Sequence, residues 1–348
     1  MRRVGIWGAS GMAGGEVLRL LARHPEMETV RAVSARHAGE PVWHQHPHLR
    51  HALGDMVFSS PEEARRRAEE VDLVFLAVPH GAGADIAAFH VARGVRVADM
   101  SADFRLRDPE DHRRWYGTPH PCPDLLARAV YGLPEFHREA LRETPVASGV
   151  GCNATCTNLG LRPLAARGLI REARIEVRAG SSEGGGTPTV GSHHPYRRGA
   201  LRVVEPFRHR HAAEVAQETG MPLSAFSFTL TAAEMVRGAQ MLAHVTLTEA
   251  MEEKALWRLY REAYGGEPFV ELCPARPAHL RFPDPRRVLG SNRALVGFAL
   301  DEGGTRLLVG CAIDNLMKGA AGSAVQCANL MLGFEETAGL DALAVYPA

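Results

Sequence analysis

The chain has 348 residues, of which 45% are hydrophobic, and this length fits two domains with substantial cores better than one. Basic and acidic residues number 40 each, so no net charge favours nucleic acid or an anionic membrane as a partner. No early apolar run has the length of a signal peptide or membrane span, which predicts a cytoplasmic protein. The six cysteines are scattered without a CxxC pair, which argues against a disulfide framework and a structural zinc site.

Strands and helices alternate in the first third of the chain. Val4 to Trp7 has the composition of a short buried strand, and Glu16 to Arg23 has the apolar spacing of a helix. The same alternation continues through strands at 29–35, 71–79 and 95–102 and helices at 61–70 and 84–93. Strands joined by helices of this length form βαβ units, so residues 1–150 are predicted to be a Rossmann-type α/β domain with a parallel sheet.

The pattern changes near Ala147, which predicts a second domain over residues 151–314. A helix begins near Ala154, and another covers Met251 to Ala263. Strands are predicted at 174–180, 224–230 and 240–249, followed by a hairpin over "DEGG" within 294–313. This mixture indicates a largely antiparallel α+β domain. The helical segment "DNLMKGAAGSAVQCANLML" is predicted to return to the first domain, which assigns residues 315–348 to that domain.

A glycine-rich turn separates the first strand from the first helix. Gly8, Gly11 and Gly14 have GxxGxxG spacing, a variant of the dinucleotide fingerprint. Such a turn lets the backbone approach a pyrophosphate, which the helix N-terminus then holds. The alternative is a turn with no ligand. The candidate cofactor residues here are Gly8, Ser10, Gly11, Met12 and Ala13.

The end of the second strand bears on the choice of cofactor. An NAD site usually has Asp or Glu there for the ribose hydroxyl, whereas this chain has Ser34, Ala35 and Arg36. A hydroxyl and a guanidinium suit a 2′-phosphate, so NADP is the predicted cofactor. The alternative is that Arg36 is a solvated loop residue.

Cys152 is the candidate nucleophile. It follows Gly149 and Gly151 at the predicted start of a helix, where the positive end of the helix dipole lowers the pKa of a thiol. A reactive thiol that works with a nicotinamide indicates thioester chemistry, in which hydride reduces a bound acyl carbon. The alternative is a small buried residue, and Cys156 one turn later is the spare thiol.

Thioester reduction also needs an acid/base, and two histidines offer one. His209 and His211 precede Glu214 near the start of a helix in "PFRHRHAAEV". An HxH pair without a third ligand is a weak metal signal. The histidine-rich run from Arg36 to His51 is predicted to be a solvated loop rather than a metal site.

Several segments together resemble the N-acetyl-γ-glutamyl-phosphate reductase family, which is similar in fold and chemistry to aspartate-semialdehyde dehydrogenase. The resemblance implies NADPH-dependent reduction of an acyl phosphate to an aldehyde with phosphate release. It also implies a catalytic and dimerisation domain and a homodimer or homotetramer. The segments, in chain order, are "GASGMAG", "VFLAVPHG", "DMSADFRL", "AVYGLPE", "GVGCNAT", "HRHAAEV", "LGSN" and "DNLMKGAAGSAVQ".

The resemblance also implies roles for individual residues. Cys152 would be the nucleophile and His209 the acid/base, although the residues themselves leave the choice between His209 and His211 open. Asn315 would approach the nicotinamide from the returning helix. Arg105 resembles an anion-holding arginine of related enzymes.

Two departures from the family pattern point to its lysine-biosynthesis branch. The nucleophile stands in "GCNAT" instead of "GCYPT", and "GSSEGGGTPTVGSHHPYRRGALRV" replaces an "SGAGR"-type loop. The branch reduces a 2-aminoadipate 6-phosphate whose amino group is attached to a small acidic carrier protein. The residues predicted to bind substrate and carrier are Arg105, His193, His194, Arg197, Arg198, Arg202, His211 and Glu214.

Other readings of this loop and site remain open. The arginines can be a solvated loop rather than a platform that steers the carrier. The same chemistry on free N-acetylglutamyl phosphate would place the enzyme in arginine synthesis, and one enzyme can serve both pathways. A non-enzymatic NADP-binding sensor on the same fold would bind cofactor without turnover.

Overall fold

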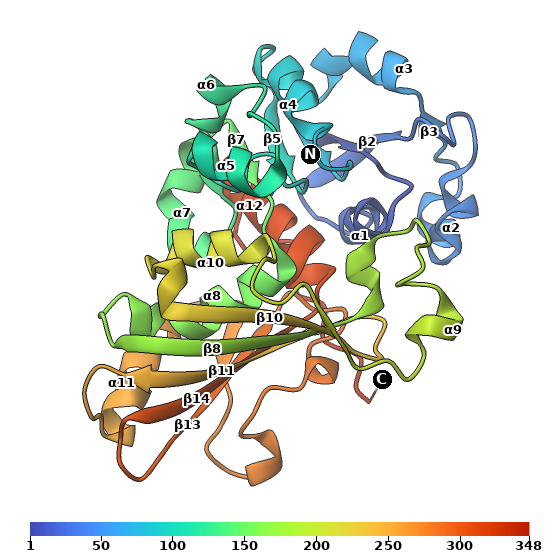
Figure 1. Ribbon diagram of the computed structural model, residues 1–348. Coiled ribbons are helices and arrows are strands. Elements are labelled where there is room, and N and C mark those ends of the chain that lie inside the picture. The colour runs from blue at the N-terminus through green and yellow to red at the C-terminus, as the bar shows by residue number, and fades with distance from the viewer. Residues whose placement is uncertain (348) are drawn as a thin grey trace. The chain divides into compact units, whose positions relative to one another are not determined.

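The computed structural model describes residues 1–347 and divides into two compact units (Figure 1). The first unit comprises Met1–Val150 and Ala320–Asp341, and the second comprises Gly151–Gly319 with the last residues from Ala342. Each unit contains a seven-stranded sheet. Within the described residues, no helix is both long and apolar enough to cross a membrane.

The sheet of the first unit is parallel throughout, as its alternating strands and helices predict. Its strand order is β3-β2-β1-β4-β5-β7-β6, so the order reverses beside β1. In such sheets the reversal point is where ligands bind, just beyond the carboxyl ends of the strands. The strands are β1 Arg2–Trp7, β2 Met27–Val33, β3 Phe58–Ser59, β4 Leu73–Leu76, β5 Arg96–Asp99, β6 Val130–Tyr131 and β7 Val146–Ser148.

Capping residues and prolines mark the start of several helices in the first unit. Pro61 opens α3, and the Ser60 hydroxyl caps it by accepting the Glu63 amide, whereas α1 begins at Met12, earlier than the apolar spacing predicts. The returning helix α12 packs on α1, α7 and β5. The helices are α1 Met12–Leu21, α2 Arg50–Leu53, α3 Pro61–Arg66, α4 Gly83–Val91, α5 Pro109–Tyr116, α6 Pro123–Leu126, α7 Pro134–Glu143 and α12 Gly322–Leu332.

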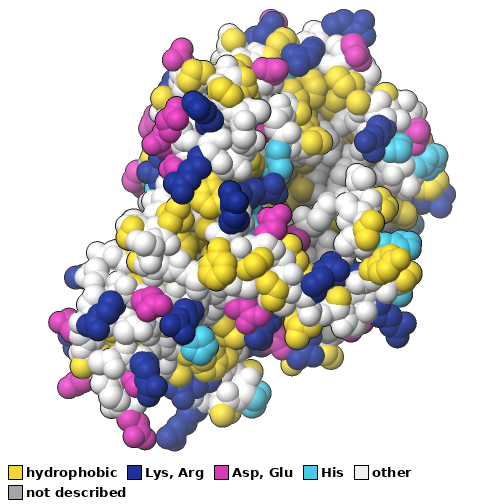
Figure 2. Space-filling model, viewed as in Figure 1, with side chains coloured by type: hydrophobic (Ala, Val, Ile, Leu, Met, Phe, Trp, Pro, Cys, Tyr) yellow, Lys and Arg dark blue, Asp and Glu magenta, His cyan; other side chains and the backbone are white. Residues whose placement is uncertain are grey.

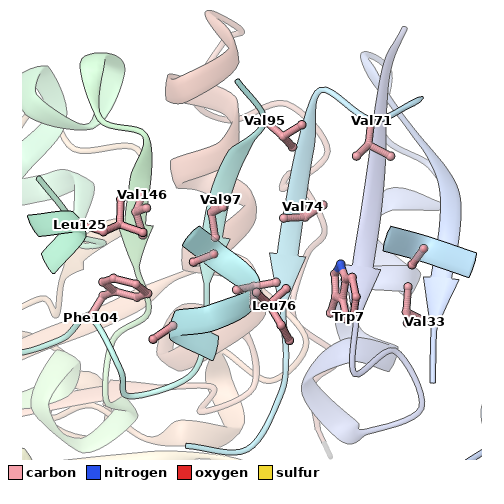
Figure 3. Packing of buried hydrophobic residues seen from close by; sticks show 14 of the residues in the cluster. Trp7, Val33, Val71, Val74, Leu76, Val95, Val97, Phe104, Leu125 and Val146 are labelled. Atoms are coloured by element: carbon pink, nitrogen blue, oxygen red, sulfur yellow. The ribbon is translucent and has the colours of Figure 1, made fainter. Parts of the chain in front are cut away.

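A hydrophobic cluster joins one face of this sheet to α3, α4 and α6 (Figure 3). Alternate strand residues such as Val74, Leu76 and Val97 point into it, because successive side chains of a strand face opposite sides. Trp7, at the end of β1, is 4% exposed and contributes to the same cluster. The buried cluster therefore holds in place the strand end from which the glycine turn departs.

The sheet of the second unit is mixed and largely antiparallel, as the sequence predicts. Only the β8–β10 and β12–β13 pairs are parallel, and the order is β12-β13-β14-β11-β8-β10-β9. The strands are β8 Ile170–Ala179, β9 Arg202–Val204, β10 Phe226–Ala232, β11 Ala239–Leu247, β12 Val270–Leu272, β13 Ala294–Leu300 and β14 Arg306–Ile313.

Helix α8, Cys152–Ala165, is the central helix of the second unit. It packs across β8, β11 and β14, with α10 (His211–Thr219) beside it on the same face (Figure 1). Two tyrosines of α11 (Glu253–Tyr264) brace it: the Tyr260 hydroxyl donates to the Gly160 carbonyl, and the Tyr264 hydroxyl to the Leu159 carbonyl. Both tyrosines are buried, so the core fixes the position of the helix that begins at Cys152.

Short helical turns complete the fold. The four-residue helix α9, His194–Arg197, lies in the arginine-rich segment, and a π-helical turn at Met317–Ala321 leads into α12. The 3-10 turns are Val42–His44, Pro47–Leu49, Ala68–Glu70, Ser181–Gly184, Leu223–Ala225, Ala278–Leu280 and Pro285–Arg287.

Candidate active site

The glycine turn has the geometry of a phosphate cradle. Gly8 has φ +75°, and a Cβ there would lie 2.2 Å from the Ala77 carbonyl oxygen, so glycine is required for packing. A Cβ on Gly14 would lie 2.5 Å from the Gly8 oxygen. A Cβ on Gly11 would meet only that oxygen, at 3.5 Å, so open space lies over the start of α1. Backbone amides that face open space at a helix N-terminus fit a dinucleotide pyrophosphate.

The end of β2 comes close to this turn. The Ser34 hydroxyl lies 2.9 Å from the Ser10 hydroxyl, and it also accepts the His37 amide at 3.3 Å. Ala35 and Arg36 follow and are exposed. Two hydroxyls therefore meet at one edge of the turn, and the exposed Arg36 follows Ser34 by two residues. Met12 and Ala13 are the first two residues of α1.

His46 corrects the prediction that the histidine-rich run is a solvated loop. It is 7% exposed, and its Nε2 lies 2.8 Å from the Ala9 carbonyl oxygen, to which it donates because a carbonyl only accepts. The ring also lies against Gly15, where a Cβ would stand 2.3 Å from Cε1. Burial lowers the His46 pKa. His46 thus braces the glycine turn, and nothing in the local sequence distinguishes it from its neighbouring histidines.

The residues described form no group of three or more His, Cys, Asp or Glu side chains with the geometry of a metal site. His209 and His211 have their rings at nearly right angles, with centroids 4.5 Å apart.

The loop after β5 is built on buried carboxylates. Asp103 accepts the amides of Gly81, Gly83 and Ala84 at 2.7, 2.8 and 3.0 Å, and so caps α4. Asp99 is 1% exposed, and burial raises its pKa to about 7. Sequence reasoning selected neither residue, because an acid in "DMSADF" carries no burial signal.

Arg105 lies in the same loop and is 7% exposed. Its Nε donates to the Ser101 carbonyl at 3.1 Å, and a second guanidinium nitrogen donates to the Met100 carbonyl at 3.3 Å. The loop backbone therefore orients this guanidinium. Its role as an anion-holding arginine stays a prediction.

Cys152 is the first residue of α8, with Gly151 as the N-cap. Its side chain is partly exposed and packs on Gly319, where a Cβ would stand 2.5 Å from the Cys152 Cβ. The thiol thus lies at the positive end of a long helix, the setting that favours a thiolate. Cys156 is fully buried, with its thiol 3.0 Å from the Cys311 carbonyl oxygen, which suits the spare thiol and not the nucleophile.

A carboxyl group that sequence reasoning missed lies beside Cys152, the candidate nucleophile. The Cys152 sulfur is 3.8 Å from Glu183 Oε2, and the Asn153 side-chain amide donates to the same oxygen at 3.0 Å. Exclusion of water from around the carboxyl group raises the pKa of Glu183, against the opposing effects of Asn153 and Arg197. One signal could have found it: Glu183 is the single acidic residue in the stretch 180–203.

The two candidate acid/base histidines have different surroundings. A Cβ on Gly151 would stand 2.7 Å from His211 Nε2, so this imidazole lies against the residue that precedes Cys152. His211 Nε2 is 3.9 Å from Glu214 Oε1, and the other Glu214 oxygen accepts the Gly151 amide at 2.8 Å. The N-cap of α8 is therefore tied to Glu214 and packed against His211.

His209 precedes α10 and is oriented differently. Its ring stacks on Phe228 with centroids 5.8 Å apart, and its Nδ1 accepts the His211 amide at 3.3 Å. Burial lowers the His209 pKa to about 4. His209 therefore supports the start of α10, while His211 and Glu214 face the start of α8.

Asn315 belongs to the second unit, just after β14, and not to the helix that returns to the first unit. Its Oδ1 accepts the Gly238 amide at 2.7 Å, and its Nδ2 donates to the Ser182 hydroxyl at 2.9 Å. These bonds fix the amide plane. The approach of Asn315 to a nicotinamide stays a prediction.

The arginine-rich segment is mostly exposed. His193, His194, Arg198 and Arg202 face solvent, whereas Arg197 is half-buried and donates to the Ala179 carbonyl at 2.9 Å. Burial lowers the pKa of Arg197. Elsewhere on the visible face, basic and acidic side chains are interspersed (Figure 2). The segment also exposes large hydrophobic residues, namely Val190, Tyr196, Leu201 and Val203.

Both units match models of one protein family. Residues 3–144 match the NAD binding domain of semialdehyde dehydrogenase, and residues 152–315 match its dimerisation domain. The chain belongs to the semialdehyde dehydrogenase family and is an oxidoreductase of this type, with a nicotinamide-dinucleotide-binding first unit.

The more similar relatives fall within one branch of this family. A Thermomicrobium roseum protein, provisionally named LysW-L-2-aminoadipate 6-phosphate reductase, is 45% identical over 99% of both chains. The LysW-L-2-aminoadipate/LysW-L-glutamate phosphate reductases of Saccharolobus solfataricus and Sulfurisphaera tokodaii are each 43% identical, over 99% and 98% of both chains. These relatives confirm the resemblance to the lysine branch.

Solved structures of low identity share the fold. Aspartate semialdehyde dehydrogenase II of Vibrio cholerae, complexed with ASA, is 16% identical with a TM-score of 0.70, covering 96% of this chain and 98% of its own. The Candida albicans enzyme with NADP is 17% identical with a TM-score of 0.67, covering 95% and 98%. The predicted two-domain fold class is thereby confirmed.

Proposed function

We propose that this protein is an NADPH-dependent reductase of lysine biosynthesis by the aminoadipate route. It converts a carrier-linked 2-aminoadipate 6-phosphate to the semialdehyde and releases phosphate. The observation that carries the proposal is the near full-length identity of 41–45% to relatives named for this reaction. As a biosynthetic enzyme it is expected in the cytoplasm, and its match to a dimerisation domain supports a homodimer or homotetramer.

Cys152 is the nucleophile of the proposed reaction. Its thiolate attacks the carbonyl carbon of the acyl phosphate, the bond from carbon to the phosphate oxygen breaks, and a Cys152 thioester forms. A bound dihydronicotinamide supplies the hydride that reduces the acyl carbon. The first amides of α8 would donate to the oxyanion at this carbon, because such amides have no acceptor within the helix and no side chain of the N-cap residue Gly151 caps them.

We assign the acid/base role to His211. The family resemblance alone would assign it to His209. His211 lies against Gly151 and near Glu214, which supports a shuttle that protonates the oxyanion and later removes that proton. Loss of the proton lets the carbon–sulfur bond break and frees the aldehyde. His209 has a pKa of about 4 and stacks on Phe228, which argues for a supporting role.

The proposed cofactor is NADP. Gly8, Gly11 and Gly14 would hold the pyrophosphate at the start of α1. Ser10, Ser34 and Arg36 would hold the 2′-phosphate, because two adjacent hydroxyls and an exposed guanidinium supply donors where an NAD site would have an acid.

A second substrate is favoured by the names of the archaeal relatives. The S. solfataricus and S. tokodaii enzymes are named for both aminoadipate and glutamate linked to LysW. The same site would then reduce carrier-linked glutamyl phosphate, which is one methylene shorter. The exposed His193, His194, Arg198 and Arg202, with Arg197, would attract a small acidic carrier by charge complementarity.

The proposal is tested by NADPH oxidation with three substrates at low and moderate salt. The substrates are carrier-linked aminoadipyl phosphate, carrier-linked glutamyl phosphate and free N-acetylglutamyl phosphate. A carrier preference that weakens as salt rises supports the lysine assignment and the basic segment. Equal or better turnover of the free substrate would instead indicate an arginine-pathway reductase. Cofactor binding without turnover of any of the three would indicate the sensor.

A further inference from the structure

The carboxyl group of Glu183 contacts the atom that reacts. Its Oε2 lies 3.8 Å from the Cys152 sulfur, within hydrogen-bonding range for a thiol, and 3.0 Å from the side-chain nitrogen of Asn153. Asn153 is fully buried, as the second residue of α8. The amide therefore holds one carboxyl oxygen of Glu183 beside the thiol.

The turn that carries Glu183 is anchored to the core of the second unit. The Ser181 and Ser182 amides donate to the carbonyls of Met235 and Val236 at 2.8 and 3.0 Å. Ser182 is 5% exposed, and its hydroxyl bonds to Asn315. Although the residue as a whole is exposed, protein atoms surround much of its carboxyl group. Its backbone is anchored at the two residues that precede it, Ser181 and Ser182, and this anchor presents the carboxyl group to Cys152.

We propose that Glu183 is the base that takes the proton of the Cys152 thiol when sulfur attacks the acyl phosphate. The S–H bond breaks, the proton moves to Oε2, and the sulfur electron pair forms the bond to the acyl carbon as phosphate leaves. After the aldehyde departs, Glu183 returns the proton to the thiolate. The inference rests on the proposed thioester route and divides proton transfer between two groups: Glu183 serves sulfur, and His211 serves the substrate oxygen.

The charges around Glu183 suit this role. A carboxylate that stayed ionised beside a thiolate would repel it, whereas a carboxylate that has accepted the thiol proton is neutral. Exclusion of water favours the neutral acid, while Asn153, the Cys152 thiol and the charges of Arg197 and Arg210 favour the anion. The net effect is a raised pKa of Glu183, which favours its acceptance of the thiol proton, as a base requires.

The test is the burst of phosphate released from carrier-linked aminoadipyl phosphate in the absence of NADPH, which isolates thioester formation. We compare the wild type with Glu183→Gln, Glu183→Asp and the control Glu302→Gln, an exposed glutamate in the β13–β14 turn. Glu183→Gln is expected to slow the burst about 10²-fold, the usual contribution of a general base. Glu183→Asp should retain part of the rate because it keeps a carboxylate.

The pH profile separates a base from a structural residue. In Glu183→Gln the acidic limb of the burst rate should move to higher pH, because the thiol must then ionise without an internal acceptor. A burst within two-fold of wild type, or a slower burst with an unmoved limb, overturns the inference. A wild-type enzyme that gives no burst, or a Cys152→Ala variant that still reduces substrate, would instead overturn the proposed function itself.

Discussion

At the scale of single residues, neighbours in the chain differ in what their side chains contact. His209 and His211 are two positions apart, yet one ring stacks on Phe228 and the other lies against Gly151. Cys152 and Cys156 are likewise one helical turn apart, and only Cys152 is partly exposed.

Cys152, the proposed nucleophile, gives the first prediction. Cys152→Ala should lose all reductase activity while it keeps its fold, since no other thiol lies at the start of α8 in the described structure. NADPH oxidation and circular dichroism measure the two properties. As a control, Cys156→Ala should remain active and lose about 1 kcal/mol of stability through the buried sulfur that it removes.

The two histidines give the second prediction. His211→Ala should lower kcat by roughly 10² to 10⁴-fold, because it removes the proposed proton shuttle. The kcat of His209→Gln should stay within about five-fold of the wild-type value, because the glutamine side chain can still accept the His211 amide. Loss of that hydrogen bond would cost only about 1 kcal/mol. Steady-state rates decide between them. The reverse order of effects would return the acid/base role to His209.

At the scale of elements, the glycine turn depends on a residue from another part of the chain. Gly8 and Gly14 are required by backbone packing, whereas Gly15 is required by the His46 ring. His46 itself lies between two 3-10 turns and donates to Ala9 in the turn. The local sequence predicts the turn, but not the side chain that holds it.

His46→Ala should therefore weaken cofactor binding more than it lowers kcat. Loss of one buried hydrogen bond, worth about 1 kcal/mol, corresponds to a roughly five-fold higher Kd for NADPH, measured by fluorescence titration. His46→Gln, which retains a donor, should recover part of the affinity. An unchanged Kd in His46→Ala would show that the turn is rigid without the histidine.

At the scale of the whole molecule, titration of one buried acid should shape stability. Asp99 has a folded-state pKa of about 7, raised by burial from 3.8, so the folded state holds the proton more tightly than the unfolded state. The protonated Asp99 therefore contributes its full stabilisation below about pH 4. As pH rises through 7 this contribution is lost, which lowers the free energy of unfolding by up to about 4 kcal/mol.

Denaturant titrations between pH 4.5 and 8 measure this effect as the difference between wild type and Asp99→Asn. As pH rises across this range, the free energy of unfolding of the wild type should fall relative to that of Asp99→Asn. His90 and His209 contribute in the opposite direction, because burial lowers their pKa values to about 4. Both histidines are present in the wild type and the variant, so their contribution is removed when the two proteins are compared. A difference that does not vary with pH would contradict the raised pKa.

The sequence by itself determined the features that depend on neighbouring residues. These features are the alternation of strands and helices, the glycine turn and the cysteine at a helix start. They follow from local periodicity and backbone preference, which depend only on residues that are close together in the sequence. The family resemblance added the reaction class, since ordered motifs over nearly the whole chain identify it.

Only the tertiary structure decided which side chains meet. Glu183 contacts Cys152, which lies 31 positions earlier in the chain. His211 packs against Gly151, 60 positions earlier, and the buried His46 donates to Ala9, 37 positions earlier. Such contacts arise because the sheets and helices fold segments back on one another. Spacing along the chain carries no measure of distance between segments that pack together only in the folded protein.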